Sequence, residues 1–243
     1  ALFLTICSIG IPNAVSKLVS ERLAIGDSKG AHKIFKIAII TFGFVGFLCS
    51  IILFTCAHNI SYNWFQIPEA ELSLLALSPS IFFVSITAVI KGYFNGRENL
   101  QVGANSQTIE QIFRTIMTII LIEFIAHNTG LDTKIMAAGA AVSTTLSEII
   151  CFTYLFKYYK SVRKEIANEI KRGLNYKYRG IRKTISDILS VSIPMSIGPI
   201  LGSINKNIDS MTIVRGLKNF MTETQSKLEY GILCGKIDTL VAF

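Results

Sequence analysis

The stretch IAIITFGFVGFLCSIILFTCA, residues 37–57, contains no charged side chain and decides the fold class. A second uncharged run, LSLLALSPSIFFVSITAVI, covers residues 72–90. An α-helix that crosses the hydrocarbon core of a bilayer needs roughly 20 mostly apolar residues, and each run is long enough. Two such runs exclude an ordinary soluble core. They predict an all-α fold, a polytopic transmembrane helix bundle.

The composition of the 243-residue chain agrees with this prediction. Hydrophobic residues make up 51% of it and charged residues 16%, whereas roughly a quarter of a soluble domain is charged. The mean hydropathy is +0.49. The net charge of +8 does not indicate nucleic acid, because the basic residues fall in loops between hydrophobic runs. Membrane lipids are the expected surroundings.

The cysteines indicate no metal site, cofactor or redox motif. They lie in apolar stretches, without a CxxC pair and without histidine or cysteine at metal-ligand spacing. Cysteines in such surroundings usually behave as small buried hydrophobes. The five are Cys7, Cys49, Cys56, Cys151 and Cys234.

Hydropathy, with charges as boundaries, predicts seven helical segments. The chain opens and closes inside hydrophobic stretches, 1–15 and 230–243, so the first and last segments are expected to be cut by the chain ends. The predicted segments are one ending near residue 19, then 34–57, 72–94, 103–126, 135–156 and 184–204, and one running to residue 243.

Loop charges predict the orientation, because Lys and Arg near span ends are retained on the cytoplasmic side. The first and third loops are basic, whereas residues 59–71 carry no Lys or Arg and the fourth loop carries only Lys134. The connection 157–183 is the most basic. The first, third and fifth loops are therefore predicted to be cytoplasmic.

The basic connection also separates two groups of helices. Its helical pattern over 161–170, flanked by tyrosines, is typical of a segment lying on an anionic membrane surface, and a solvated linker is the alternative. We therefore predict a truncated N-terminal lobe over 1–156, an inter-lobe loop over 157–183 and the start of a C-terminal lobe over 184–243.

Ionisable residues inside spans are costly and usually face a bundle interior or a water-filled cavity. The segment 103–126 is the most polar and contains Gln107, Gln111, Glu110 and Arg114. Glu110 and Arg114 are four residues apart and are predicted to form an ion pair on one helix face. Whether that pair is structural or lines a cavity stays open. Glu148, in mid-span, would have a raised pKa or need a partner on a neighbouring helix.

Pro194, Gly198 and Pro199 lie inside the predicted span 184–204. Proline inside a helix removes a backbone hydrogen bond, so we expect a kink or an unwound turn there. Broken helices at membrane depth mark binding sites or hinges in transporters, although such residues are also common in ordinary spans. The three residues are the hinge candidates.

No catalytic motif is present. The chain contains no G-x-x-x-x-G-K-[ST] loop, no H-E-x-x-H and no G-x-S-x-G. The loops are short or simply basic, so we do not expect an enzyme.

Several motifs are distributed along the chain: GIPNAVSKLVSE at 10–21, GAHKIF at 30–35, KGYFNG at 91–96 and SQTIEQIFR at 106–114. These motifs resemble those of the stage V sporulation protein B group of polysaccharide-biosynthesis membrane proteins. Ile193-Pro194 and Ile208-Asp209-Ser210 resemble later elements of that group. The resemblance runs the length of the chain.

The resemblance implies a fragment of a two-lobe MATE-like exporter fold in the bacterial cytoplasmic membrane, related to lipid II flippases. It implies alternating-access export of a polyprenyl-pyrophosphate-linked saccharide or peptidoglycan precursor, in cell-wall or spore-cortex synthesis. A pyrophosphate needs cationic partners, which Arg supplies best. The substrate-pathway candidates are Lys17, Glu110, Arg114 and Glu148.

Two other functions remain open on the sequence alone. A cation-coupled multidrug antiporter of the same superfamily should prefer acidic and aromatic residues in its cavity. A non-transporting membrane scaffold would instead recruit cell-wall or spore-assembly proteins through the basic connection.

Overall fold

The computed structural model describes residues 9–64, 68–129, 133–173, 180–217 and 220–233. Every regular element within these ranges is a helix, which confirms the all-α prediction. The elements are α2 (Ile11–Ala24), α3 (Ser28–Asn59), the π-helix η2 (Ile60–Trp64), the 3₁₀-helix η3 (Pro68–Ala70), α4 (Glu71–Gly96), α5 (Leu100–Thr129), α6 (Thr133–Arg172), α7 (Ile181–Leu217) and α8 (Glu223–Ile232).

Four described helices are long and apolar enough to cross a membrane, over Ser28–Asn63, Glu71–Gly96, Lys134–Arg172 and Ile181–Gly202. The chain is therefore a multi-pass membrane protein. The predicted span 103–126 corresponds to α5, which is not among the four. Its apolar residues are interrupted by Glu110, Arg114 and Glu123, which are ionisable groups that are costly in contact with lipid.

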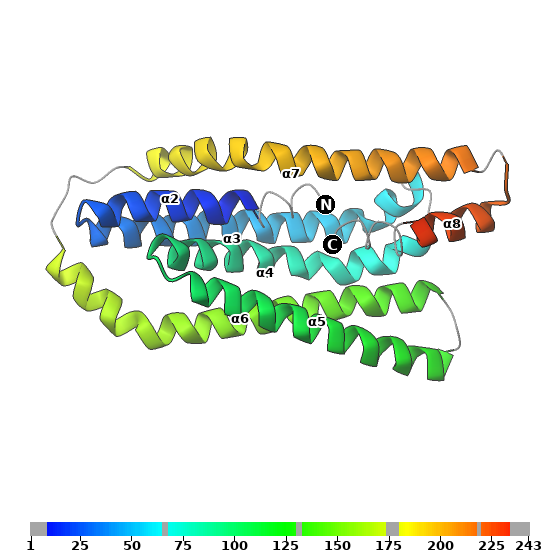
Figure 1. Ribbon diagram of the computed structural model, residues 1–243, viewed down its shortest axis with the longest axis horizontal. Coiled ribbons are helices and arrows are strands. Elements are labelled where there is room, and N and C mark those ends of the chain that lie inside the picture. Colours follow the sequence, from blue (N-terminus) through cyan, green and yellow to red (C-terminus); the bar gives the residue numbers. More distant parts are fainter. Residues whose placement is uncertain (1–8, 65–67, 130–132, 174–179, 218–219, 234–243) are drawn as a thin grey trace.

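The long helices lie side by side along the longest axis of the molecule (Figure 1). The helix α4 lies at the centre, in contact with α2, α3 and α6, and α5 packs mainly on α6. The helix α7 packs on α2 and α3, on the opposite side from α5. This order places α4, α5 and α6 around one shared interior.

Two glycines let α2 and α4 pack closely. A Cβ on Gly92 would lie 2.6 Å from the carbonyl oxygen of Pro12, and a Cβ on Gly96 would lie 2.6 Å from that of Ser16. Gly92 and Gly96 are four residues apart and so face the same side of α4. They form a small-xxx-small contact of the kind that brings membrane helices together. In the sequence these glycines stand out only as part of the KGYFNG motif.

The helix α6 is longer than predicted. The structure continues it without a break from the expected span into the basic segment, as far as Arg172. Hydropathy falls at Lys157, but Lys, Arg, Glu and Ala are good helix formers. Past that point Ile166 is buried, and Val162 and Ile170 pack against the core, so the apolar stripe continues. The separate helix expected over 161–170 is thus the end of α6.

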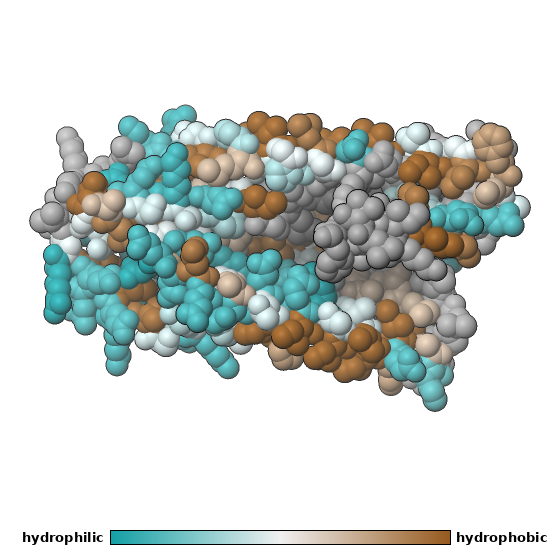
Figure 2. All heavy atoms as spheres, in the orientation of Figure 1, coloured by the Kyte–Doolittle hydropathy of each residue, from teal (hydrophilic) through white to brown (hydrophobic). Residues whose placement is uncertain are grey.

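The predicted boundary between residues 156 and 157 consequently falls inside α6, and residues 174–179 lie outside the described ranges. The division into lobes stays a prediction. The end of α6 reaches α4, because Nη2 of Arg97 donates to Oε2 of Glu169 at 2.6 Å. Figure 2 shows hydrophilic side chains gathered at this end of the bundle, where α2 meets α3 and α6 ends.

The helix α7 is unbroken from Ile181 to Leu217, with Pro194 and Pro199 inside it. The unwound turn that was one expectation for this segment is therefore not present. The hinge role of Pro194, Gly198 and Pro199 stays a prediction. The last predicted segment begins within α8, and its remainder from residue 234 lies outside the described residues.

Replacement of Gly92 by Ala should destabilise the bundle. The added methyl group meets the backbone of Pro12, which cannot move away as a side-chain tip can, and overpacking of this kind costs about 1–3 kcal/mol. We expect a lower thermal unfolding midpoint for the detergent-purified protein.

Gly202→Ala is the matched control, because no atom lies within 4 Å of the point that its Cβ would occupy. An Ala there improves helix propensity and should leave the midpoint unchanged or raise it. Equal midpoints for Gly92→Ala and the unmodified protein would contradict the close packing of α2 on α4.

Candidate functional site

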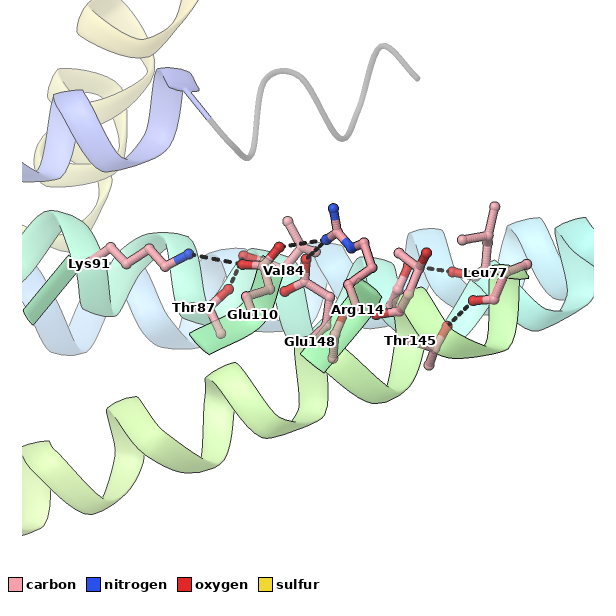
Figure 3. A network of polar contacts seen from close by, with 12 residues as sticks. Leu77, Val84, Thr87, Lys91, Glu110, Arg114, Thr145 and Glu148 are labelled. Atoms are coloured by element: carbon pink, nitrogen blue, oxygen red, sulfur yellow. Dashed lines mark hydrogen bonds and ion pairs between the residues drawn. The ribbon is translucent and has the colours of Figure 1, made fainter. Parts of the chain in front are cut away.

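A charged cluster joins three helices inside the bundle (Figure 3). The carboxylate of Glu110 on α5 accepts a hydrogen bond from Nη2 of Arg114 at 2.5 Å and lies 3.4 Å from Nζ of Lys91 on α4. Nη2 of Arg114 also lies 3.5 Å from Oε1 of Glu148 on α6. We call these four residues, Lys91, Glu110, Arg114 and Glu148, the charge cluster.

The two carboxylates of the charge cluster are buried, each residue being 7% exposed. Burial of a charge costs several kcal/mol unless it is paired, and here two cations compensate two anions. Oxygen atoms of Glu110 and Glu148 and the sulfur of Cys151 also lie within 4.8 Å of one another. Because Lys91 and Arg114 already neutralise the carboxylates, ion pairing accounts for this group without a metal.

One donor of the cluster remains unused. The Nε atom of Arg114 is buried and has no hydrogen-bond partner within the described part of the chain. Buried donors without partners are rare in folded proteins and often occur where a ligand or a second conformation completes the contact. The guanidinium group therefore keeps unused hydrogen-bonding capacity at the centre of the cluster.

Small and hydroxyl-bearing residues of α6 allow α5 to approach the cluster closely. The hydroxyl groups of Thr118 on α5 and Ser143 on α6 are 2.5 Å apart. A Cβ on Gly139 would lie 2.6 Å from Cδ1 of Ile125. On the other side of α6, Thr145 donates to the carbonyl oxygen of Ala76 on α4 at 2.6 Å. These contacts hold α4, α5 and α6 together around the ion pairs.

The charge cluster lines a cavity of about 760 Å³. Its walls come from the start of α2 and from α4, α5 and α6, and its polar lining includes carboxamides as well as the four charges. The described lining residues are Ile9, Pro12, Asn13, Leu77, Ser80, Val84, Thr87, Ala88, Lys91, Asn95, Leu100, Gly103, Ala104, Gln107, Glu110, Gln111, Arg114, Thr144 and Glu148. No aromatic side chain is among them.

The structure brings three of the four predicted pathway residues together. The ion pair between Glu110 and Arg114 is confirmed, and both residues also line the cavity, so the two interpretations left open by the sequence hold at once. Glu148 has a partner on a neighbouring helix, Arg114, which was one of the two expectations for it.

Lys17 is the exception. It is exposed on α2, is not among the residues that line the cavity, and is in none of the ion pairs between described residues. Its role in a substrate pathway stays a prediction, as do the roles of the other three.

Sequence reasoning missed Lys91. Its position near a span end indicates a loop cation that reports orientation, whereas it lies within the last turns of α4 and faces Glu110. The feature of the sequence that could have placed Lys91 inside the bundle is its position at the start of the KGYFNG motif. The glycines of that motif pack against α2, and a residue just before such a contact is expected inside the bundle.

Comparison with known proteins agrees with this architecture. Residues 1–219 match the family described as Polysaccharide biosynthesis protein. Stage V sporulation protein B of Bacillus subtilis (strain 168) is 27% identical over 245 residues, covering 98% of this chain and 45% of that protein. Lipid II flippase MurJ of the same organism is 27% identical over 150 residues, covering 58% of this chain and 26% of that protein. The chain thus spans less than half the length of these relatives.

Two solved structures of a MATE family multidrug resistance transporter of the MOP superfamily share the fold. One is inward-facing, with a TM-score of 0.64 and 16% identity. The other is outward-facing, with a TM-score of 0.65 and 17% identity. Each likeness covers 88% of this chain and 45% of the solved one. The predicted MATE-like fold is confirmed.

Replacement of Glu110 by Gln should destabilise the protein, because Lys91 and Arg114 both lose their nearest anion. Removal of one member of a buried ion pair typically costs about 3–5 kcal/mol. We expect a lower thermal unfolding midpoint in detergent.

Glu123→Gln on the same helix is the control, because Glu123 is exposed and is in none of the ion pairs between described residues. A midpoint for Glu110→Gln that matches the Glu123→Gln value would show that the cluster adds nothing to stability.

Proposed function

The chain belongs to the polysaccharide biosynthesis protein family, and from that premise we propose that the full-length protein is a membrane flippase or exporter. Its proposed substrate is a polyprenyl-pyrophosphate-linked saccharide or peptidoglycan precursor. Transport proceeds by alternating access across the cytoplasmic membrane, in cell-wall or spore-cortex synthesis. We further propose that residues 1–156 belong to one lobe and residues 184–243 to the start of another.

The observation that carries this proposal is a cavity among helices that includes two cations. Lys91 and Arg114 both line it. A pyrophosphate that crosses a hydrocarbon layer needs compensating positive charge, and a guanidinium group offers bidentate, permanently charged hydrogen bonding. The unpartnered Nε atom of Arg114 gives this side chain a further donor for an anionic oxygen.

The lining favours this substrate over a cationic drug. Organic cations are commonly held against aromatic rings, and none of the described lining residues is aromatic. The two acidic residues of the cavity are occupied by Lys91 and Arg114. Of the two features expected of a multidrug antiporter, acidic residues line the cavity but are paired with cations, and aromatic residues are absent from its described lining.

The central experiment is leaflet translocation of fluorescent lipid II by the full-length protein in liposomes. We expect translocation by the unmodified protein and its loss, by about tenfold or more, in Arg114→Ala and Glu110→Ala, since a 1.4 kcal/mol change corresponds to tenfold. Arg163→Ala and Glu123→Ala, at exposed positions outside the cavity, should retain activity.

Each alternative function predicts its own combination of results in this assay and in cells. No movement of lipid II by the unmodified protein, together with drug resistance in cells, would favour the antiporter. Loss of function on neutralisation of the basic end of α6, with Arg114→Ala active in cells, would favour the scaffold.

The proposed hinge in α7 leads to a separate expectation. A double replacement, Pro194→Ala with Pro199→Ala, restores two backbone donors inside an unbroken helix and should stiffen it. We expect slower translocation with unchanged binding of the lipid, because neither proline lines the cavity. Transport at the unmodified rate would remove these residues from the mechanism.

A further inference from the structure

One exposed face of α6 changes from apolar to basic along the helix. The large hydrophobic side chains that α6 exposes are Val142, Leu146 and Phe156. An α-helix returns to the same face after about 18 residues, or five turns, so Lys160 lies on the face of Val142 and Lys164 on the face of Leu146. Both lysines are exposed. The face that suits lipid chains in the first part of α6 is therefore cationic in the second.

Four exposed cations begin this second part: Lys157, Lys160, Arg163 and Lys164. Their spacing of three and four residues places them on one side of the helix, and we call them the basic face. None of them is in an ion pair between described residues, and none lines the cavity. Their charge is available to a partner outside the described part of the chain.

Packing on the other side of α6 fixes the direction of the basic face. Ile166 is buried, and Val162 and Ile170 pack against the core. Glu169 accepts a hydrogen bond from Arg97 on α4 at 2.6 Å. Figure 1 shows this end of α6 bending toward the turn between α2 and α3. Rotation of the helix would break these contacts, so the basic face stays turned away from the bundle.

The length of α6 places the basic face at the depth of lipid head groups. From Lys134 to Lys157 the helix rises about 35 Å, slightly more than the roughly 30 Å of bilayer hydrocarbon. From Lys157 to Lys164 it rises about a further 10 Å, and the head-group layer on each side is roughly 5–8 Å thick. Nζ of Lys160 also lies 4.8 Å from the ring centre of exposed Phe156. Apolar contact and positive charge therefore meet within one turn at this boundary.

From these observations we propose that the basic face binds the phosphate groups of anionic phospholipids in the leaflet at this end of the bundle. Clustered Lys and Arg directly beside a membrane span attract anionic head groups, and side chains of this length can reach them. Bound lipid would hold α6 at a fixed depth, and with it Glu148 of the charge cluster. The proposal does not depend on the identity of the transported substrate.

Lys171 separates a lipid from a soluble acidic partner. It lies seven residues beyond Lys164 and on the same face, and it is exposed, but it is about 10 Å farther along the helix. A lipid phosphate at the bilayer surface would not reach it, whereas a soluble acidic partner would contact it as readily as the other four cations.

The test introduces a photoreactive benzophenone amino acid at position 161 of the full-length protein, because Ser161 is exposed beside the basic face. The protein is reconstituted in vesicles of equal parts phosphatidylglycerol and phosphatidylcholine, and one of the two lipids carries a detectable tag in each experiment. We expect at least about tenfold more labelling by phosphatidylglycerol, since each cation near an anionic surface contributes about fivefold.

A quadruple variant replaces all four residues of the basic face by Gln and should be labelled about equally by the two lipids. Lys171→Gln is the matched control and should keep the tenfold preference. Because the four side chains are exposed, the thermal unfolding midpoint of the quadruple variant in a neutral detergent should match that of the unmodified protein. That match separates loss of lipid binding from loss of the fold.

Equal labelling by both lipids in the protein with an intact basic face, or a preference that survives in the quadruple variant, would overturn the proposal. An equal loss of preference in Lys171→Gln would also overturn it, because the effect would then not depend on depth. No labelling by either lipid would place this face away from the bilayer and favour a soluble acidic partner instead.

Discussion

The structure depends on the mutual neutralisation of four charges between helices that lie in a membrane. Glu110 contacts both cations, and Arg114 contacts both carboxylates. A single buried carboxylate at this depth would cost several kcal/mol. The charge cluster removes that cost only while α4, α5 and α6 stay together. The ion pairs therefore fix the relative positions of these three helices, and the cavity exists because they are fixed.

Close packing around the cluster has a second cause, the small residues at the helix contacts. Gly92 and Gly96 bring α2 to α4, and Gly139 brings α6 to α5. In lipid no hydrophobic gain favours one helix contact over another, so van der Waals fit decides which helices meet. Here that fit places Asn13 of α2 on the same cavity as the charges of α4, α5 and α6.

Much of this arrangement could be predicted from the sequence. Uncharged runs indicated the helices, and the spacing of Glu110 and Arg114 indicated an ion pair, because both are local properties of one helix. Lys91 could not be assigned in this way, since its partner lies on another helix and a lysine near a span end is most simply a topological signal. The end of α6 was missed because hydropathy reports where the bilayer stops. The helix continues as long as backbone propensity and buried residues such as Ile166 support it.

The same ion pairs and helix contacts indicate which of the described helices can move relative to one another. Separation of α5 from α6 would leave the carboxylate of Glu148 without Arg114, and separation of α5 from α4 would leave Lys91 without Glu110. These three helices are therefore expected to move as one body. The helix α7 packs chiefly on α2 and α3 and contains two prolines that supply no backbone donor. Deformation there breaks none of the ion pairs of the charge cluster. We therefore propose that the movement with the lowest cost is one in which α7 bends or tilts against an intact α4–α6 unit, because that movement keeps the charges of the cluster compensated.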